Sequence, residues 1–338
     1  MGRRFYPRGA ARRSPGRVAY TARMPDAAAR PRRAWIALLA LGTVTVIWGV
    51  TFSWMKESQL AARAALGPGH ALETVALYMG LRFGIAALLL ALVPRATRRA
   101  DRGAWRGGFL LAALLYSGFL VQMLGLEEIT PAVSAFLTSL YVLFTALLLA
   151  RKAHQRPGPA LIAGALLATL GAGLIRGRPE LDLRTGEVLT VLSAVIFAVH
   201  ILATDKVTRA SDALAATWCC FVWTALFAAA TFGFLRLAGA GAELHAVGAL
   251  LVSRAWLEPL LLSAVFATVV ALSLMNLFQK ELDPLRAAIV YAIEPLWALF
   301  FGVWKGLDVL SGWLWIGGAL LLAGNLVAEL GPRRKPGA

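Results

Sequence analysis

Two ionisable side chains lie deep inside long apolar stretches of the sequence. Arg82 lies near the middle of the apolar run 73–93, and Glu294 stands directly before Pro295 in the run 285–304. An ionisable group in hydrocarbon is costly unless it faces a cavity or a partner, so both are candidate functional residues. Arg82 could hold an anionic or carboxylate-bearing solute, or it could brace neighbouring helices by donating to backbone carbonyls.

Glu294 also has two interpretations. Pro295 lacks an amide hydrogen and its ring clashes with the preceding turn, so a kink beside the carboxylate is expected. Glu294 could then bind a proton and couple proton binding to occupancy of the site, or it could form a structural ion pair with Arg82. His200, in the run 186–204, could shuttle protons near neutral pH, or it could be a packed core residue.

Polar and aromatic side chains within the apolar runs complete the candidate substrate-binding site. Some of them could pack without contacting substrate, whereas an aromatic ring could stack on a flat or cationic solute. Besides the three ionisable groups, the candidates are Trp48, Tyr78, Tyr116, Gln122, Tyr141, Asn276, Tyr291 and Trp297. We rank Trp48 first. Tryptophans near the ends of the runs are expected at the membrane interface instead: Trp35, Trp105, Trp256, Trp313 and Trp315.

The residue types that carry most enzyme chemistry are scattered. No spacing typical of a metal site or of a nucleophile with its base is visible around the histidines. They are His70, His154, His200 and His245. Cys219 and Cys220 are adjacent, which excludes a disulfide framework and a spaced zinc site. No glycine-rich run precedes a Lys-Ser or Lys-Thr pair, which disfavours an ATP-driven pump. We therefore predict no catalytic residue, no metal and no cofactor.

Composition indicates the environment of these residues. Of 338 residues, 59% are hydrophobic and only 15% are charged, whereas soluble domains contain about 25% charged residues. Ten apolar runs are long enough, or nearly so, to cross a bilayer as helices. They are 34–55, 73–93, 106–126, 129–150, 158–175, 186–204, 213–235, 257–278, 285–304 and 309–329. The sequence predicts an all-α integral membrane protein with ten transmembrane helices.

The positive charge follows the connections between the runs. The chain has 34 Lys and Arg against 18 Asp and Glu. The basic residues are concentrated in the N-terminal segment and in alternate connections, as the positive-inside rule requires. This predicts a cell (inner) membrane protein with both termini cytoplasmic, and it disfavours nucleic acid as a partner. Residues 1–33 are expected to be a disordered basic tail, although a start at Met24 or an organellar transit peptide are alternatives. Residues 331–338 are expected to form a second basic tail.

The two halves of the sequence resemble each other. The turn 127–131, which ends in Pro131, precedes the fourth run much as 280–284, which ends in Pro284, precedes the ninth. The segments 48–56 and 197–206 correspond at a similar offset. We infer two five-helix repeats, 34–176 and 186–330. Because five is odd, the second copy must insert upside down, and such inverted repeats are typical of secondary transporters.

Several short motifs occur in order along this plan. They are Val46–Gly49, Leu81–Phe83, the turns at Pro131 and Pro284, and Glu294-Pro295 followed by 296–302. With them, residues 35–330 resemble the EamA-type branch of the drug/metabolite transporter superfamily. The resemblance implies a ten-helix carrier that moves small metabolites by alternating access, with export of amino acids or related compounds as the expected activity. Members often carry a glutamate after the ninth helix, whereas this chain has Trp304-Lys305-Gly306. Because of this difference, the resemblance does not identify the coupling ion or the residues of the outer gate.

Two helices carry stripes of small residues. The fifth run has small residues every four positions, and the tenth run has a similar stripe, so close packing against each other or across a homodimer is expected. The positions are Ala160, Gly164, Ala168 and Ala172, with Ala319, Ala323, Gly324 and Ala328. The expected partners are a small-molecule substrate and the lipid bilayer, and a proton is one candidate for the coupling ion. A membrane-embedded enzyme and a non-transporting membrane scaffold are the alternative functions.

Overall fold

The computed structural model describes residues 31–152, 158–175, 184–282 and 290–330, and every regular element in these ranges is helical. The two expected tails lie outside the described residues, apart from residues 31–33, which begin the first helix. Pro284 and its turn also lie outside them. The helical content agrees with the predicted fold class, since backbone groups in hydrocarbon must be satisfied within their own segment.

Within the described residues, seven helical segments are long and apolar enough to cross a membrane. These are α1 (Pro31–Leu66), α2 (Ala71–Ala91), α4 (Arg102–Leu126), α5 with α6 (Pro131–Thr138 and Tyr141–Lys152), α8 (Thr185–Ala210), α9 (Ala213–Leu237), and α11, η2 and α12 (Arg254–Leu262, Ser263–Val270 and Ala271–Phe278). Three more apolar helices are shorter: α7 (Pro159–Leu174), α14 (Glu294–Trp304) and α15 (Gly312–Leu330). Short helices α3 (Pro94–Arg98) and α10 (Leu244–Val252) lie between the longer ones.

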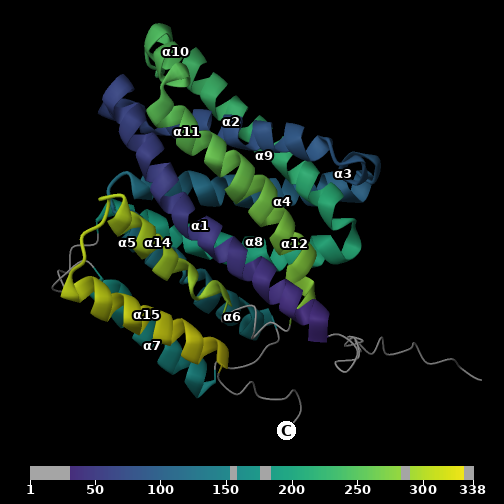
Figure 1. The fold of residues 1–338 in the computed structure, drawn as a ribbon, viewed down its shortest axis with the longest axis vertical. Helices are drawn as coiled ribbons and strands as arrows, with labels where there is room; N and C mark the ends of the chain where they lie inside the picture. The colour runs from purple at the N-terminus through teal and green to yellow at the C-terminus, as the bar shows by residue number, and fades with distance from the viewer. Residues whose placement is uncertain (1–30, 153–157, 176–183, 283–289, 331–338) are drawn as a thin grey trace, which may run out of the picture.

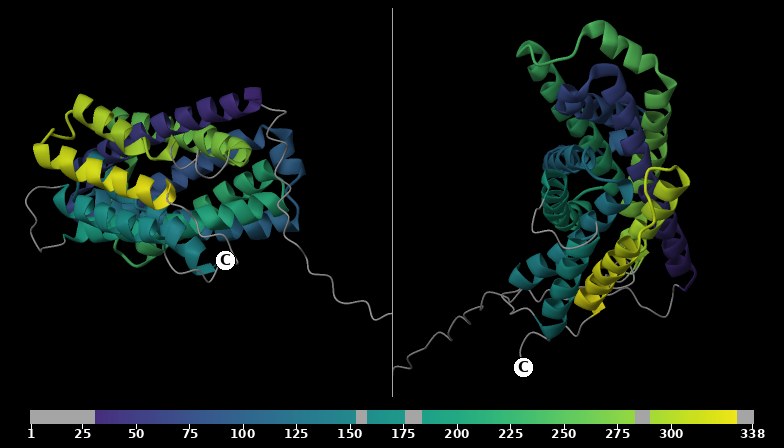
Figure 2. Two further views of the ribbon diagram at one scale, coloured as in Figure 1. Left: turned by 90° about the horizontal axis from the view of Figure 1, so that it is seen from below. Right: turned by 90° about the vertical axis from the view of Figure 1, so that its left-hand side faces the viewer.

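The long helices form one bundle with a pair of helices at its edge (Figures 1 and 2). Helix α1 runs along α14 on one side and along α11, η2 and α12 on the other. Helix α4 packs against α8 and α9, and α2 packs against α9 and η2. Helices α7 and α15 lie side by side at the edge, and α15 contacts α5 and α6.

Helix α1 extends beyond its expected end at residue 55 to Leu66. Its last three turns contain four alanines together with Lys56 and Arg63, which are good helix formers but poor membrane residues. The helix stops at Gly67, whose φ of 85° suits glycine, and Pro68 follows. The apolar run thus ends where the side chains become polar, near residue 55, whereas the helix itself continues until Gly67 stops it.

The fourth run forms two helices. Thr130 is the N-cap of α5 and Pro131 is its first residue, which agrees with the expected tight turn. The run then breaks between α5 and α6 around Ser139. Asn325 of α15, fully buried, donates to the Ser139 carbonyl at 3.0 Å and so satisfies a backbone group beside the break.

The small-residue stripes bring α7 and α15 into backbone contact. A Cβ atom on Gly164 would lie 2.5 Å from the Gly324 carbonyl oxygen, and one on Gly171 would lie 2.5 Å from the Leu321 nitrogen. Of the two expected arrangements, the structure has the packing within one chain, as glycine-rich stripes allow in membrane helices. The homodimer stays a prediction.

One expectation about the interface was wrong. Trp256 was expected in the interfacial belt, but its side chain has 0% exposure and packs edge-on against Tyr78, with ring centroids 6.3 Å apart. Its place in the first turn of α11 directs it towards α2, because α2 and α11 are in contact there. Trp35 and Trp315, with 66% and 54% exposure, are compatible with the belt.

We predict that Gly171→Leu destabilises the protein by about 1–3 kcal/mol or more, because overpacking forces two backbones apart. The matched control is Gly173→Leu two positions along α7, where a Cβ atom would meet nothing within 4 Å. Thermal unfolding in detergent measures both. Equal losses in the two variants would contradict the packing described here.

Candidate functional site

The eighth apolar run contains a π-helical segment, η2 (Ser263–Val270), between α11 and α12. Such segments are often found at functional sites. Two side chains of α2 contact it: the Tyr78 hydroxyl donates to Ser263 Oγ at 2.7 Å, and Arg82 Nε donates to Thr268 Oγ1 at 2.7 Å. The Thr268 hydroxyl in turn donates to the Ser263 carbonyl at 3.0 Å. Arg82, Tyr78 and η2 therefore form one polar network.

The Arg82 guanidinium lies away from water, with only 1% exposure. Its Cζ lies 4.9 Å from the Phe119 ring centroid and 5.5 Å from that of Phe83, and Nη1 contacts Met55 Sδ at 3.8 Å. Cation–π contacts contribute about 2 kcal/mol when desolvated, less than the several kcal/mol that burial of a charge costs. Within the described ranges, no carboxylate forms an ion pair with Arg82, and the hypothesised pair with Glu294 is not formed.

Trp48 connects this network with Glu294. Its Nε1 donates to the Ala267 carbonyl of η2 at 3.3 Å. Its ring stacks on Tyr291, with centroids 6.2 Å apart and an interplanar angle of 25°. Tyr291 stands one turn before Glu294, whose buried carboxyl is hydrogen-bonded to the Tyr141 hydroxyl. Six predicted residues therefore form a series from Arg82 to Glu294, in which the step from Tyr291 to Glu294 is proximity along the chain.

The other predicted residues lie elsewhere. His200 and Asn276 line a separate cavity of about 10 Å³, roughly the space of one water molecule. Asn276 Nδ2 donates to Thr217 at 2.6 Å beside it. The remaining three contact residues outside this series. Tyr116 donates to Thr231 at 2.7 Å, Gln122 donates to Thr138 at 2.9 Å, and the Trp297 Cβ lies against Gly49. The structure thus brings together only part of the predicted set.

Three polar contacts join distant parts of the chain at the end that the charge pattern predicts to be non-cytoplasmic. They are Lys305 Nζ to Glu57 at 2.6 Å, the Ala132 amide to Asp308 at 3.0 Å, and the Gly186 amide to Glu128 at 2.9 Å. We call these the outer-end contacts. In the last two, a carboxylate accepts from the first turn of a helix, where the backbone favours negative charge. Apart from Lys305, which replaces the family's glutamate after the ninth helix, the sequence did not single out these residues, because each is an ordinary loop charge until its partner is known.

Asp308 is the most buried of these carboxylates, with 5% exposure. Burial raises its pKa above the usual range, although the Thr130 hydroxyl, the Ala132 amide and the nearby Lys56 act in the opposite direction. Together with Glu128, Asp308 also borders a cavity of about 280 Å³ at this end of the molecule.

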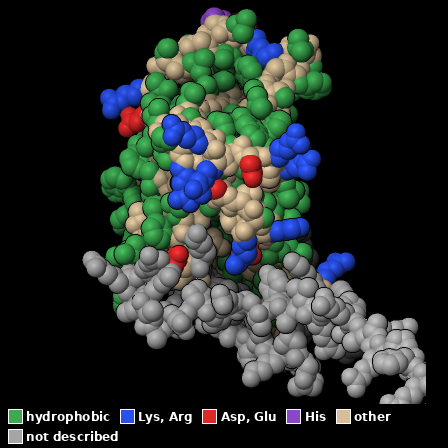
Figure 3. Space-filling view, turned by 90° about the vertical axis from the view of Figure 1, so that its right-hand side faces the viewer, with side chains coloured by type: hydrophobic (Ala, Val, Ile, Leu, Met, Phe, Trp, Pro, Cys, Tyr) green, Lys and Arg blue, Asp and Glu red, His purple; other side chains and the backbone are tan. Residues whose placement is uncertain are grey.

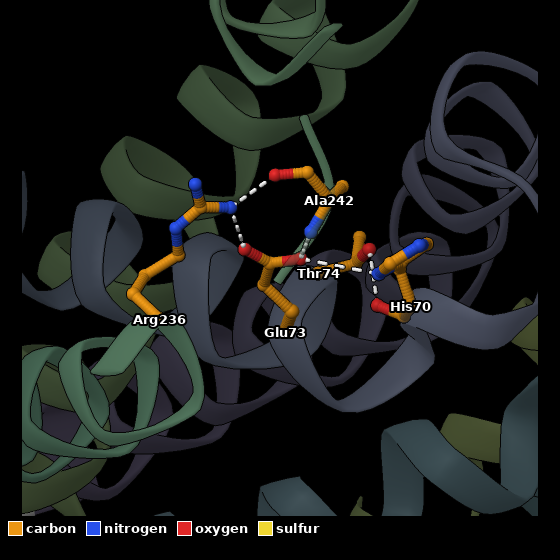
Figure 4. Close-up of polar contacts among 5 residues, drawn as sticks. All are labelled: His70, Glu73, Thr74, Arg236 and Ala242. Atoms are coloured by element: carbon orange, nitrogen blue, oxygen red, sulfur yellow. Dashed lines mark hydrogen bonds and ion pairs between the residues drawn. The ribbon is translucent and has the colours of Figure 1, made fainter. Parts of the chain in front are cut away.

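A second network at the same end surrounds Glu73, at the start of α2 (Figure 4). This buried carboxylate pairs with Arg236 at 3.0 Å and His70 at 3.4 Å, and it accepts from the Ala242 amide at 2.7 Å. Arg236 also donates to the Ala242 carbonyl. Glu73 therefore attaches the segment after α9 to α2, and the sequence alone did not indicate this.

Comparison with known proteins finds similarity to transporters. Residues 34–177 match the model of the EamA-like transporter family. A protein of Archaeoglobus fulgidus named as an uncharacterized transporter is 26% identical over 299 residues, which cover 86% of this chain and 85% of that protein. One crystal structure is similar with a TM-score of 0.57 and 21% identity over 88% of this chain and 97% of that one. The last likeness concerns the fold alone.

We predict that Thr268→Val destabilises the protein by about 1–3 kcal/mol, because it leaves the buried Arg82 Nε without its acceptor. The matched control is Thr204→Val. The Thr204 hydroxyl is also buried but has no hydrogen-bond partner in the described part of the chain, so its loss should be nearly neutral. Thermal unfolding with and without the substitutions measures the difference. A neutral Thr268→Val would show that Arg82 does not depend on η2.

Proposed function

We propose that this multi-pass membrane protein is a secondary transporter that exports amino acids or related small metabolites, because residues 34–177 match the model of the EamA-like transporter family. It would lie in the cell membrane with both termini cytoplasmic. The observation that carries the proposed substrate class is the buried Arg82, which has no carboxylate partner in the described structure. A carboxylate-bearing solute would supply the missing negative charge.

The site contains one basic and one acidic side chain, Arg82 and Glu294, and this combination favours a zwitterionic solute. Glu294 lies at the other end of the series through Trp48 and Tyr291. A solute carboxylate at Arg82 and a solute ammonium towards Glu294 would complement both buried groups. The stacked rings of Trp48 and Tyr291 would contact the part of the solute between its charged ends. An intermediate affinity is expected, since a carrier must also release its substrate.

The packing of the helices supports two inverted repeats. If each span of the first half is exchanged with the span five positions later, the observed helix pairs map onto one another. The pair of α1 with η2 and α12 corresponds to that of α8 with α4, and the pair of α1 with α14 corresponds to that of α8 with α6. The pairs α2 with α9, α5 with α14, and α7 with α15 correspond to themselves. Such exchange symmetry is expected of a repeat related by an axis in the membrane plane.

Alternating access gives the outer-end contacts a role. Each of the three contacts joins a residue of the proposed first repeat to one of the second. If the repeats rock against each other, these contacts must separate when the outer end opens. They would therefore stabilise the conformation in which that end is closed.

We predict that Arg82→Gln weakens binding of a transported amino acid about tenfold or more, since a buried charge-assisted pair is lost. A panel of amino acids, polyamines, nucleosides and sugars is tested for thermal stabilisation of the detergent-solubilised protein, and hits are tested for export from reconstituted vesicles. Glu294→Gln should weaken binding of zwitterions more than that of simple carboxylates. Arg254→Gln, a change at an exposed position, is the control.

Loss of transport together with retained ligand-induced stabilisation in Arg82→Gln would overturn the binding role. A wild-type protein that binds and exports none of the panel would overturn the proposed function.

We predict that the outer end opens more readily as the pH rises. Asp308 has a raised pKa in the closed form because of burial, and it would return to its usual range when opening hydrates it. The closed form therefore binds the proton more tightly, so acid favours closure and a rise of pH through the shifted range favours opening. Accessibility of a cysteine introduced near Asp308 measures opening, and Asp308→Asn should reduce its pH dependence. Closure that strengthens with rising pH would contradict this sign.

A further inference from the structure

Arginines gather where α2, α3 and α4 meet, at the end predicted to be cytoplasmic. The exposed residues Arg95, Arg98, Arg99, Arg102 and Arg106 form what we call the arginine patch. Figure 3 views the molecule from the side of α3 and shows Lys and Arg side chains surrounded by hydrophobic ones. The acidic side chains within the same stretch of sequence are limited to Asp101, so positive charge predominates.

Part of the patch is held in place by Asp212. Arg95 and Arg99 contact its carboxylate at 2.9 and 3.6 Å. Burial raises the pKa of Asp212, but the bonds from Arg95 and from the amides of Leu214 and Ala215 outweigh this and keep the pKa below its usual value. Asp212 is therefore ionised at neutral pH. It fixes two of the guanidinium groups against α9.

The other three arginines are not neutralised. Arg98, Arg102 and Arg106 form no ion pair with any carboxylate in the part of the chain that the structure describes. At the opposite end of the molecule, three of the described basic side chains instead have acidic partners. These pairs are Lys305 with Glu57, Arg236 with Glu73, and Arg254 with Glu258. Arg98, Arg102 and Arg106 thus bring three guanidinium groups without an acidic partner in the described chain onto one short stretch of sequence.

Exposed apolar side chains lie directly beside these arginines. Arg102 and Arg106 share a face of α4 with Leu110, because the three are spaced at four residues. Leu110 is 46% exposed, and Leu92 at the end of α2 is 76% exposed. The surface therefore changes within about two helical turns from cationic to apolar. A solute with an anionic head and an apolar tail complements both parts, whereas a free phosphate complements only the first.

We propose that the arginine patch is a binding site for an anionic phospholipid. The phosphodiester headgroup binds Arg98, Arg102 and Arg106, and the acyl chains lie along Leu92 and Leu110. Guanidinium groups bind phosphate oxygens in bidentate geometry, and juxtamembrane basic clusters attract anionic lipids of the cytoplasmic leaflet. The lipid would also hold the connection of α2, α3 and α4 against the bilayer. This inference does not depend on the proposed transport function.

The test is lipid retention by the full-length protein. Delipidated protein is titrated with phosphatidylglycerol or with phosphatidylcholine of the same acyl chains, and bound lipid is counted by native mass spectrometry. Wild type should retain phosphatidylglycerol preferentially. The triple variant R98Q/R102Q/R106Q should bind it about 100-fold more weakly, or about fivefold for each arginine removed. The corresponding triple lysine variant should bind with intermediate strength, because it keeps the charge but loses the bidentate geometry.

Two controls define the site. Arg254→Gln removes an exposed arginine at the opposite end and should leave lipid retention unchanged. Inorganic phosphate should not displace the lipid at equal concentration, because it lacks the apolar part. Equal retention of the two lipids, unchanged binding by the folded triple variant, or full displacement by phosphate would each overturn the proposal. Melting without added lipid confirms that the variants are folded.

Discussion

The cost of keeping the Arg82 charge away from water constrains the centre of this molecule. The guanidinium has one hydroxyl acceptor, a sulfur contact and two aromatic rings around it, so α2 must approach both α1 and η2 closely. The Thr268 hydroxyl is available to Arg82 because it also finds an acceptor in the Ser263 carbonyl, five residues earlier in the π-helical turn. The irregular helix and the buried charge are therefore mutually dependent, and a regular α-helix would present different groups to Arg82.

Polar groups at the two ends of the bundle are organised differently. At the outer end, carboxylates such as Glu73 and Asp308 have backbone amides as partners and attach connections to helix ends. At the other end, Asp212 fixes two arginines while three neighbouring ones have no acidic partner in the described chain. The first arrangement determines how the helices are joined. The second leaves the positive charge of three arginines available to water or lipid headgroups. Both follow from where water and lipid headgroups are available.

The sequence predicted the helical fold and the burial of Arg82 and Glu294, because both depend on local signals. Hydrocarbon demands long apolar helices, and Arg82 and Glu294 are conspicuous within them. It did not predict η2 or the roles of Thr268, Glu73 and Asp308. Those features depend on which helices meet, and a hydroxyl or carboxylate carries no such information. Trp256 was misplaced for the same reason: its distance from the end of a run says nothing about which neighbour covers it.

The break in the fourth span divides it into two parts with different neighbours. The amide of Ala132 in α5 is bonded to Asp308 at the outer end, whereas the carbonyl at the break is bonded to Asn325 of the edge helix α15. If the angle between α5 and α6 changed, the hydrogen bond from the Asn325 side chain to the Ser139 carbonyl would resist the change. The tightly packed pair of α7 and α15 would then support the break at Ser139 from one side.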